Sequence, residues 1–249
     1  MLMTSVLSPF LRSRIKSYYE SNLTDLTVIP AVNFRHFRFR LPDGSFYKVK
    51  RKIHNSKALR EHLVRKAPVD VYYSVACWLN PHLLTSRVEK DVLKNVIISC
   101  DLAFDIDYGE KMKTLEDARQ QTIALNEFLE SKGIEVRYFA FSGSKGFHIV
   151  CNDPWKDEIA EVNPIKREIK AIEKRKKIVN EAKTEGIIFD EKVTVDPRRI
   201  IRLPGTINSK TGFVCTVLSK KELESDARKI IKSAKRYVIT APRIPLIRE

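Results

Sequence analysis

Residues 96–107 (VIISCDLAFDID) form an apolar run that ends in two carboxylates, Asp105 and Asp107. A run of this kind predicts a buried strand. Because side chains i and i+2 of a strand project from the same face, we expect the two carboxylates to point together. They repel each other unless a cation lies between them, and their oxygens suit Mg²⁺ or Mn²⁺. Alternatively, the pair ends a strand in a solvated turn.

A second pattern follows, with strand-like segments at Val136–Phe141 and Phe147–Cys151 on either side of the loop 142–146 (SGSKG). The two glycines of the loop permit positive φ and a close approach of the backbone. Hydroxyl and cationic groups around such a turn predict a phosphate cradle. Four polar side chains belong to this pattern: Ser142, Ser144, Lys145 and His148. The alternative for His148 alone is a core histidine with satisfied hydrogen bonds.

A third carboxylate, Asp196, ends the strand-like segment Val193–Asp196. A loop rich in cations and turn residues follows at 197–212 (PRRIIRLPGTINSKTG) and contains Arg202. A solvated basic turn would have the same composition. Two carboxylates, a phosphate cradle and a third carboxylate are nevertheless the parts that a two-metal phosphoryl or nucleotidyl transfer requires.

Around these motifs the pattern predicts interleaved helices and strands, and therefore an α+β fold with a mixed sheet. No domain boundary is visible, so we expect a single domain over residues 1–249, with a possible helical insertion at 155–190. The other expected elements are a helix to about Tyr19, a hairpin with its turn at 42–45 (PDGS), a helix over 56–65, an apolar run over 69–79, a helix from Thr114 to about Lys132 that Gly133 ends, a charged helix between 164 and 186, a strand over 213–218 and a helix near 220–235.

The 249-residue chain is strongly basic, with a formal net charge of +15. A polyanionic partner explains this imbalance, nucleic acid first and an acidic membrane surface second. Surface ion pairs of the thermophile type would account for the 31% of charged residues but not for the excess of cations. No apolar run is long enough to cross a bilayer. The four cysteines form no zinc-binding pattern and fit buried, reduced thiols in a cytoplasmic protein.

The order of the three motifs resembles that of the archaeo-eukaryotic primase superfamily, in particular the catalytic small subunit of archaeal DNA primase. The resembling motifs are Asp-x-Asp, Ser-Gly-x-x-Gly-x-His, and an Asp followed by Arg-Leu-Pro-Gly-Thr-x-x-x-Lys-Thr-Gly. Upstream, Phe34–Phe39 and Val71–Ala76 resemble further segments of that family. The resemblance covers roughly residues 33–218.

The resemblance implies a primase catalytic core that joins nucleotides on a single-stranded DNA template and releases pyrophosphate. It assigns two divalent ions, Mg²⁺ or Mn²⁺, to Asp105, Asp107 and Asp196. It assigns the triphosphate of the incoming nucleoside triphosphate to Ser142, Ser144, Lys145, His148 and Arg202. An RNA primer as product and a primase large subunit as partner are also implied. A stand-alone primase-polymerase or a gap-filling repair polymerase is the alternative, and a catalytically inactive nucleic-acid-binding subunit is a third hypothesis.

The sequence departs from the family in three places. His36 stands where relatives often have Glu, and Asn208 where many have His. Residues 108–140 contain no Cys or His, so we expect no zinc. We therefore expect a reduced member of the family, from an archaeon or an archaeal mobile element.

Overall fold

We describe the protein from a computed structural model, which covers residues 9–21, 26–84 and 95–237. Its helices are α1 (Pro9–Ser21), α2 (Ser56–Lys66), α4 (Leu115–Ser131), α5 (Pro164–Thr184), α6 (Glu191–Val195), α7 (Lys220–Glu224) and α8 (Ala227–Ser233), with 3₁₀ turns η1 (Leu26–Val28), η2 (Val32–Phe34) and η3 (Pro81–Leu83). Its strands are β1 (Phe37–Arg40), β2 (Phe46–Lys48), β3 (Asp70–Ser74), β4 (Ala76–Trp78), β5 (Ile97–Cys100), β6 (Leu102–Asp107), β7 (Val136–Phe141), β8 (Gly146–Cys151), β9 (Ile200–Arg202) and β10 (Thr216–Leu218).

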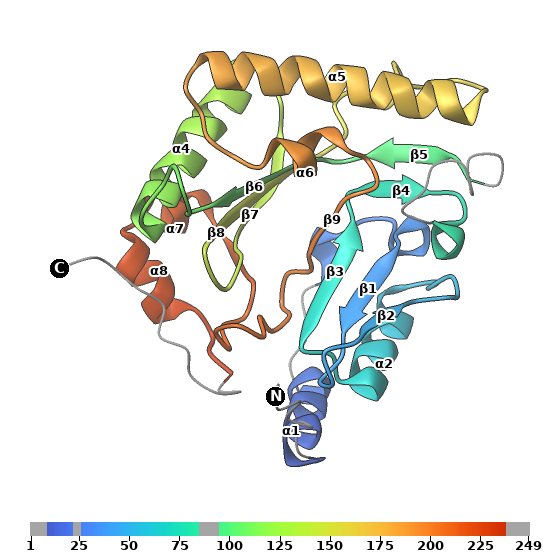
Figure 1. The fold of residues 1–249 in the computed structure, drawn as a ribbon, viewed down its shortest axis with the longest axis vertical. Coiled ribbons are helices and arrows are strands. Elements are labelled where there is room, and N and C mark those ends of the chain that lie inside the picture. The colour runs from blue at the N-terminus through green and yellow to red at the C-terminus, as the bar shows by residue number, and fades with distance from the viewer. Residues whose placement is uncertain (1–8, 22–25, 85–94, 238–249) are drawn as a thin grey trace, which may run out of the picture.

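Two four-stranded sheets form the body of the molecule (Figure 1). The first has the order β2-β1-β3-β9 and the second β10-β7-β8-β6, while β4 and β5 form a separate pair. The strand pairs within the described residues are all antiparallel. Helix α5 runs along one end of the molecule, and α4, α7 and α8 lie beside the second sheet. These features confirm the expected α+β class, but the described sheets are antiparallel, so the expectation of a mixed sheet is corrected.

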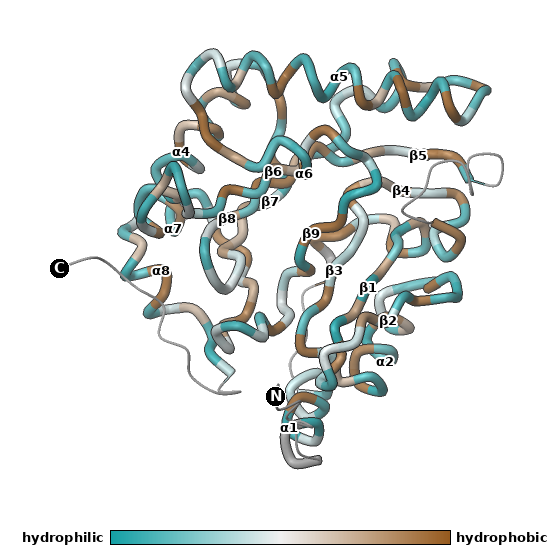
Figure 2. The backbone as a smooth tube through the Cα atoms, viewed as in Figure 1, coloured by the Kyte–Doolittle hydropathy of each residue, from teal (hydrophilic) through white to brown (hydrophobic). Residues whose placement is uncertain are grey.

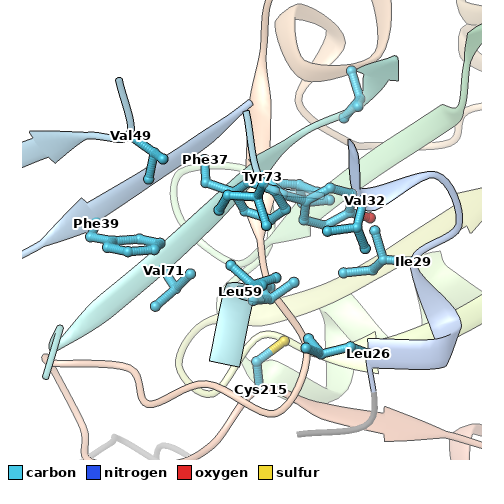
Figure 3. Packing of buried hydrophobic residues seen from close by; sticks show 14 of the residues in the cluster. Leu26, Ile29, Val32, Phe37, Phe39, Val49, Leu59, Val71, Tyr73 and Cys215 are labelled. Atoms are coloured by element: carbon cyan, nitrogen blue, oxygen red, sulfur yellow. The ribbon is translucent and has the colours of Figure 1, made fainter. Parts of the chain in front are cut away.

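The first sheet packs one face against helix α2, and α1 packs against α2. Phe37 and Phe39 of β1 and Val71 and Tyr73 of β3 lie on this face with Leu59 of α2 (Figure 3). All five side chains are buried. Since successive side chains of a strand alternate between faces, the residues between these apolar positions point to the opposite side of the sheet.

The second sheet has its own apolar core, formed with α4, α5, α7 and α8. Helix α4 begins with a capping box in which Thr114 and Asp117 satisfy each other's backbone N–H groups, and Gly133 follows its end with a φ of 68°. Hydrophobic residues gather on β6, β7 and β9, and they alternate with hydrophilic residues along α5 (Figure 2). Helix α5 falls inside the expected insertion at 155–190, but the division into one domain with an insertion stays a prediction.

A buried ion-pair network links the two sheets at Asp101. Arg35 donates to the Asp101 carboxylate over 2.6 Å, and Arg137 of β7 holds it with two hydrogen bonds of 2.7 and 3.0 Å. The Arg35 guanidinium also donates to the carbonyls of Ser74 and Val75 at the end of β3. The expectation of one continuous strand over 96–107 is therefore wrong: Asp101 interrupts it, because its side chain serves this network and its N–H donates to the Val75 carbonyl.

Other predicted elements are confirmed or corrected. The 42–45 hairpin joins β1 and β2, and the helices predicted over 56–65, 114–132 and 164–186 are present. The expected strand Val193–Asp196 is instead the short helix α6, whose N-cap Asp190 accepts a hydrogen bond from Lys192 N–H. The expected helix near 220–235 divides into α7 and α8, since Asp226 begins a second helix. The first part of the N-terminal helix, residues 1–8, lies outside the described residues.

His36 is a buried residue just before β1, and both of its ring nitrogens have polar neighbours. Its Nδ1 lies 2.9 Å from the Pro81 carbonyl, and its Nε2 accepts from Arg38 Nε over 3.2 Å. Burial, Arg38 and Lys48 lower the pKa of His36 to about 3. The ring is therefore neutral at pH 7, with Nδ1 as the donor and Nε2 as the acceptor.

This low pKa predicts an acid-sensitive fold. Because the folded-state pKa lies below the unfolded value, the contribution of His36 is fully present above pH 6.5 and is lost as the pH falls toward 3. At pH 4.5 the loss amounts to roughly 2 to 3 kcal/mol. Between pH 7.0 and pH 4.5, the free energy of unfolding measured with urea should therefore fall less for His36→Gln than for the wild type. Equal drops in the two proteins would contradict the assignment.

Candidate active site

Asp105 and Asp107 lie together at the end of β6, as their spacing predicts. Asp105 pairs with His148 across the β6–β8 ladder, and Asp107 pairs with Gly146. Residues opposite each other in a ladder share a face, and the Asp105 carboxylate lies 3.4 Å from His148 Nε2. The two carboxylates and the histidine therefore occupy one side of the second sheet, facing β9 of the first sheet across a shared pocket.

The carboxylates and the histidine of this group shift one another's pKa values. Desolvation and the neighbouring Asp105 raise the pKa of Asp107 to about 6. Burial alone would lower the pKa of His148, but its contacts with Asp105 and Cys215 raise it to about 10. The His148 imidazole is therefore protonated at pH 7 and lies beside the two carboxylates. The raised pKa of Asp107 means that its ionised form is disfavoured unless a further cation binds nearby.

The loop 142–146 is a tight turn fixed by hydrogen bonds on both sides. Ser142 N–H donates to the Gly146 carbonyl, and Gly146 N–H donates to Ser142 Oγ. Gly143 has a φ of 82°, which favours glycine, and Thr211 Oγ1 donates to its carbonyl. The Lys145 carbonyl accepts from Tyr108 N–H. The turn therefore has a defined shape, as a phosphate cradle requires.

Gly146 is required by the close approach of β6 and β8. A Cβ at this position would lie 1.8 Å from the Ile106 carbonyl oxygen and 2.7 Å from an Asp107 carboxylate oxygen. We expect Gly146→Ala to force the two strands apart and to lower the free energy of unfolding by roughly 2 kcal/mol or more. Urea unfolding measures this, with Gly109→Ala as the control because a methyl group at Gly109 would meet nothing within 4 Å. Equal stability of the two variants would contradict the close approach.

Arg202 reaches the pocket from β9 and is held in place by the first sheet. Its guanidinium donates to Asp70 over 2.6 Å, to the Ile207 carbonyl over 3.0 Å and to the Tyr72 hydroxyl over 3.1 Å. The same guanidinium lies 5.0 Å from the centre of the Tyr72 ring. Arg202 is thus preorganised, with Asp70 compensating part of its charge.

Asn208 supports the turn. Its side-chain amide donates to the Ser142 carbonyl over 3.2 Å, and its side-chain oxygen accepts from Lys210 N–H over 3.1 Å. The residue is buried. Asn208 therefore joins the loop 142–146 to the loop after β9.

Asp196 lies in a neighbouring pocket. It caps the end of α6, accepts a hydrogen bond from Arg198 N–H over 2.9 Å and forms a 3.1 Å ion pair with Arg199. This second pocket, of about 390 Å³, is lined by both α5 and α6. The structure thus brings Asp105 and Asp107 together but does not bring Asp196 to them. Within the described ranges, no three His, Cys, Asp or Glu side chains are arranged to hold one ion.

One pocket of about 200 Å³ collects the other predicted residues. Sequence reasoning missed Tyr72, Lys210 and the carboxylate of Asp70 behind Arg202. Lys210 could have been predicted from the sequence, because it belongs to the loop at 197–212. No sequence signal marks Asp70, which is distant from Arg202 along the chain. The predicted residues that line the pocket are Asp105, Asp107, Ser142, Ser144, Lys145, His148 and Arg202.

The donor set fits divalent cations. Asp105 Oδ1 is buried and, beyond the 3.4 Å approach of His148 Nε2, has no hydrogen-bond partner within the described part of the chain. An acceptor is therefore left over at the carboxylate pair. A cation there would satisfy it and would also remove the repulsion that raises the pKa of Asp107. Carboxylate oxygens are the ligands that Mg²⁺ prefers, and Mn²⁺ shares that preference.

Comparison with known proteins places the chain in a family. Residues 104–219 match the family model of the DNA primase small subunit. The chain is 30% identical to the DNA primase small subunit PriS of Pyrobaculum calidifontis, over 88% of this chain and 81% of that protein. The chain belongs to the DNA primase small subunit family. The PriS protein of Sulfolobus acidocaldarius is 24% identical, with 85% of this chain and 76% of that protein covered.

A solved structure extends the likeness to the fold. The polymerase domain of Mycobacterium tuberculosis ligase D, in a complex with DNA, superposes with a TM-score of 0.59. It covers 89% of this chain and 86% of that domain, at 15% identity. This chain and that polymerase domain therefore share a fold. Among the described residues, no helix is both long and apolar enough to span a membrane.

Proposed function

We propose that the protein is the catalytic subunit of a DNA primase and makes short RNA primers on a DNA template by nucleotidyl transfer. The observation that carries the proposal is the pocket between the sheets. It sets the carboxylates Asp105 and Asp107 on one wall and the cations Lys145, Arg202 and Lys210 around them. Negative groups for metal ions and positive groups for phosphates are what a nucleoside triphosphate requires.

Asp105 and Asp107 would hold two divalent cations, Mg²⁺ or Mn²⁺, with Asp196 as the third ligand. Such ions would supply a lowered pKa for the attacking 3′-hydroxyl and charge neutralisation at the leaving oxygen. The site of Asp196, directly after α6, favours its participation, because α6 packs on β6 and Asp190 N–H donates to the Asp105 carbonyl. Asp196 has to leave Arg199 to take part. We expect no zinc in this protein.

The remaining pocket residues hold the triphosphate. Lys145, His148 and Arg202 supply positive charge to its oxygens, and Ser142 and Ser144 supply hydroxyl donors. Held in line, the α-phosphate is attacked by the 3′-hydroxyl; the new phosphodiester bond forms as the bond to the β-phosphate breaks, and pyrophosphate leaves. Because Arg202 is already fixed by Asp70 and Tyr72, little ordering is needed when the nucleotide binds.

The expected partners are single-stranded DNA, nucleoside triphosphates and a primase large subunit. The net charge of +15 supports binding to a polyanion. A separate subunit is expected because this catalytic chain would otherwise bind its template mainly through nonspecific phosphate contacts. We expect the protein in the cytoplasm, and its four buried, free cysteines fit a reducing compartment.

A second function is favoured by one observation. The fold is that of the polymerase domain of a ligase, so a stand-alone primase-polymerase or gap-filling repair polymerase is the alternative. The two functions differ in how a chain begins. A primase joins two free nucleotides, whereas a repair polymerase extends an existing 3′ end.

The deciding experiment supplies labelled nucleoside triphosphates with unprimed single-stranded DNA, and in parallel with a primed template, in Mg²⁺ and in Mn²⁺. We expect labelled oligonucleotides from the unprimed template. Extension of the supplied primer without any product from unprimed DNA would establish the repair polymerase instead. Repeating both reactions with ribonucleotides and deoxyribonucleotides separately determines the sugar preference.

A further inference from the structure

Among the described residues, no α-helix packs on one face of the first sheet, and this open face begins at the catalytic pocket. Its strand register aligns four polar residues in one row: Arg202 opposite Tyr72, Tyr72 opposite Arg38, and Arg38 opposite Lys48. With neighbouring strands about 4.8 Å apart, this row extends about 14 Å from β9 to β2. Arg202 and Tyr72 line the pocket, so the row starts where we place the nucleotide.

A second row lies beside the first on the same face. Arg40 pairs with Asp70 on one side and with Phe46 on the other. Asp70 is buried and already bound to Arg202, and Arg40 lies 3.9 Å from it with 42% of its side chain exposed. Phe46 is 66% exposed, a high value for an aromatic side chain on a strand. The outer edge of the face therefore presents a cation and an aromatic ring to solvent.

Helix α2 packs against the other face of this sheet, and α1 packs against α2. The apolar residues of β1 and β3 point to α2 (Figure 3). Since successive side chains of a strand alternate between faces, their neighbours in the strands point away from α2. The open face contains the cations Arg38, Arg40, Lys48 and Arg202 and one buried carboxylate, Asp70. Lys48 Nζ also donates to the Leu84 carbonyl, which holds this cation at the edge of the face without cancelling its charge. Its charge is therefore complementary to a polyanion, and the neutral His36 ring helps to position Arg38.

We propose that this open face, formed by Arg38, Arg40, Lys48, Tyr72 and Phe46, binds the single-stranded nucleic acid that serves as template. The cations follow the phosphates away from the pocket, and Phe46 stacks on a base at the outer edge. Every base has a π-face, so such a platform tolerates any template sequence. Continuity with the pocket favours this occupant, since a templating base has to lie beside the incoming nucleotide. The proposal rests on the proposed function, because it names the track of that same reaction's template.

The test is the affinity for a fluorescein-labelled mixed-sequence 20-nucleotide DNA, measured by anisotropy without nucleotide or divalent metal. We expect Phe46→Leu to bind the DNA about 5- to 100-fold more weakly and Phe46→Trp to restore the affinity. The double variant Arg38→Gln/Arg40→Gln should lower the slope of log K against log salt by about 1.4 in magnitude, one phosphate contact for each arginine. Lys57→Ala, an exposed cation on α2, is the matched control.

Unchanged affinity and salt slope in the Phe46 and arginine variants would overturn the proposal, as would an equal loss in Lys57→Ala. Thermal unfolding of each variant confirms that a loss does not come from misfolding. The result is independent of catalysis. If the wild type incorporates no nucleotides while DNA binding depends on Phe46, the proposed function fails and the binding face stands. If the wild type incorporates nucleotides while DNA binding does not depend on Phe46 or on the two arginines, the binding face is rejected and the proposed function stands.

Discussion

Asp105→Asn is expected to reduce nucleotide incorporation by more than about 100-fold with little change in stability. The substitution keeps the size of the side chain but removes a charged ligand. Even the loss of a group that only hydrogen-bonds to a metal ligand typically lowers metal affinity or activity by about 10- to 100-fold. It also removes the carboxylate that lies 3.4 Å from His148 and contributes to the raised pKa of Asp107. The measurement is incorporation of labelled nucleotide on single-stranded DNA under saturating Mg²⁺ or Mn²⁺.

Asp117→Asn is the matched control for this variant. Asp117 is an exposed carboxylate in the first turn of α4, the helix that follows β6 in the chain, and it does not line the pocket. It should retain wild-type incorporation. Activity of Asp105→Asn equal to that of Asp117→Asn would refute the metal-site assignment. Asp196→Asn extends the test: full activity there would show that the neighbouring pocket does not contribute a metal ligand.

The largest effect on stability is expected from Asp101→Ala. Its carboxylate is buried between Arg35 and Arg137, and removing it leaves Arg35 buried without its counter-charge. Such a loss typically costs about 3 to 5 kcal/mol. Urea unfolding should show a lower midpoint at a similar m-value.

Lys220→Ala provides the comparison, since the Lys220–Glu130 pair is exposed on both sides and should matter little. A midpoint for Asp101→Ala as high as that of Lys220→Ala would contradict the structural role of the network. Because Arg35 also binds the carbonyls at the end of β3, the network fixes the first sheet relative to β7. Its loss should therefore also weaken the alignment of the two pocket walls.

The local pattern of the sequence predicted most of the pocket. The i, i+2 spacing of Asp105 and Asp107 placed both on one face, and the two glycines of the turn indicated a positive φ and a close backbone approach. Both properties depend on a few adjacent residues, so they can be read from short segments. The structure bears them out, with Gly143 at a φ of 82° and Gly146 against Ile106.

Features set by distant contacts could not be predicted in this way. The strand break at Asp101 depends on Arg35 and Arg137, which are far from it in sequence. Segment Val193–Asp196 alternates like a strand but forms a helix, because Asp190 caps it and because it packs on β6 instead of joining a sheet. The anchoring of Arg202 by Asp70 likewise arises only when β3 and β9 pair.

The most direct test of the central claim is whether the template dictates the nucleotide. With poly(dT) as template we expect incorporation of ATP and not of GTP, and with poly(dC) the reverse, with one pyrophosphate released for each phosphodiester bond formed. Both activities should disappear in Asp105→Asn. Incorporation that ignores the template, or that persists unchanged in Asp105→Asn, would contradict template-directed nucleotidyl transfer in this pocket.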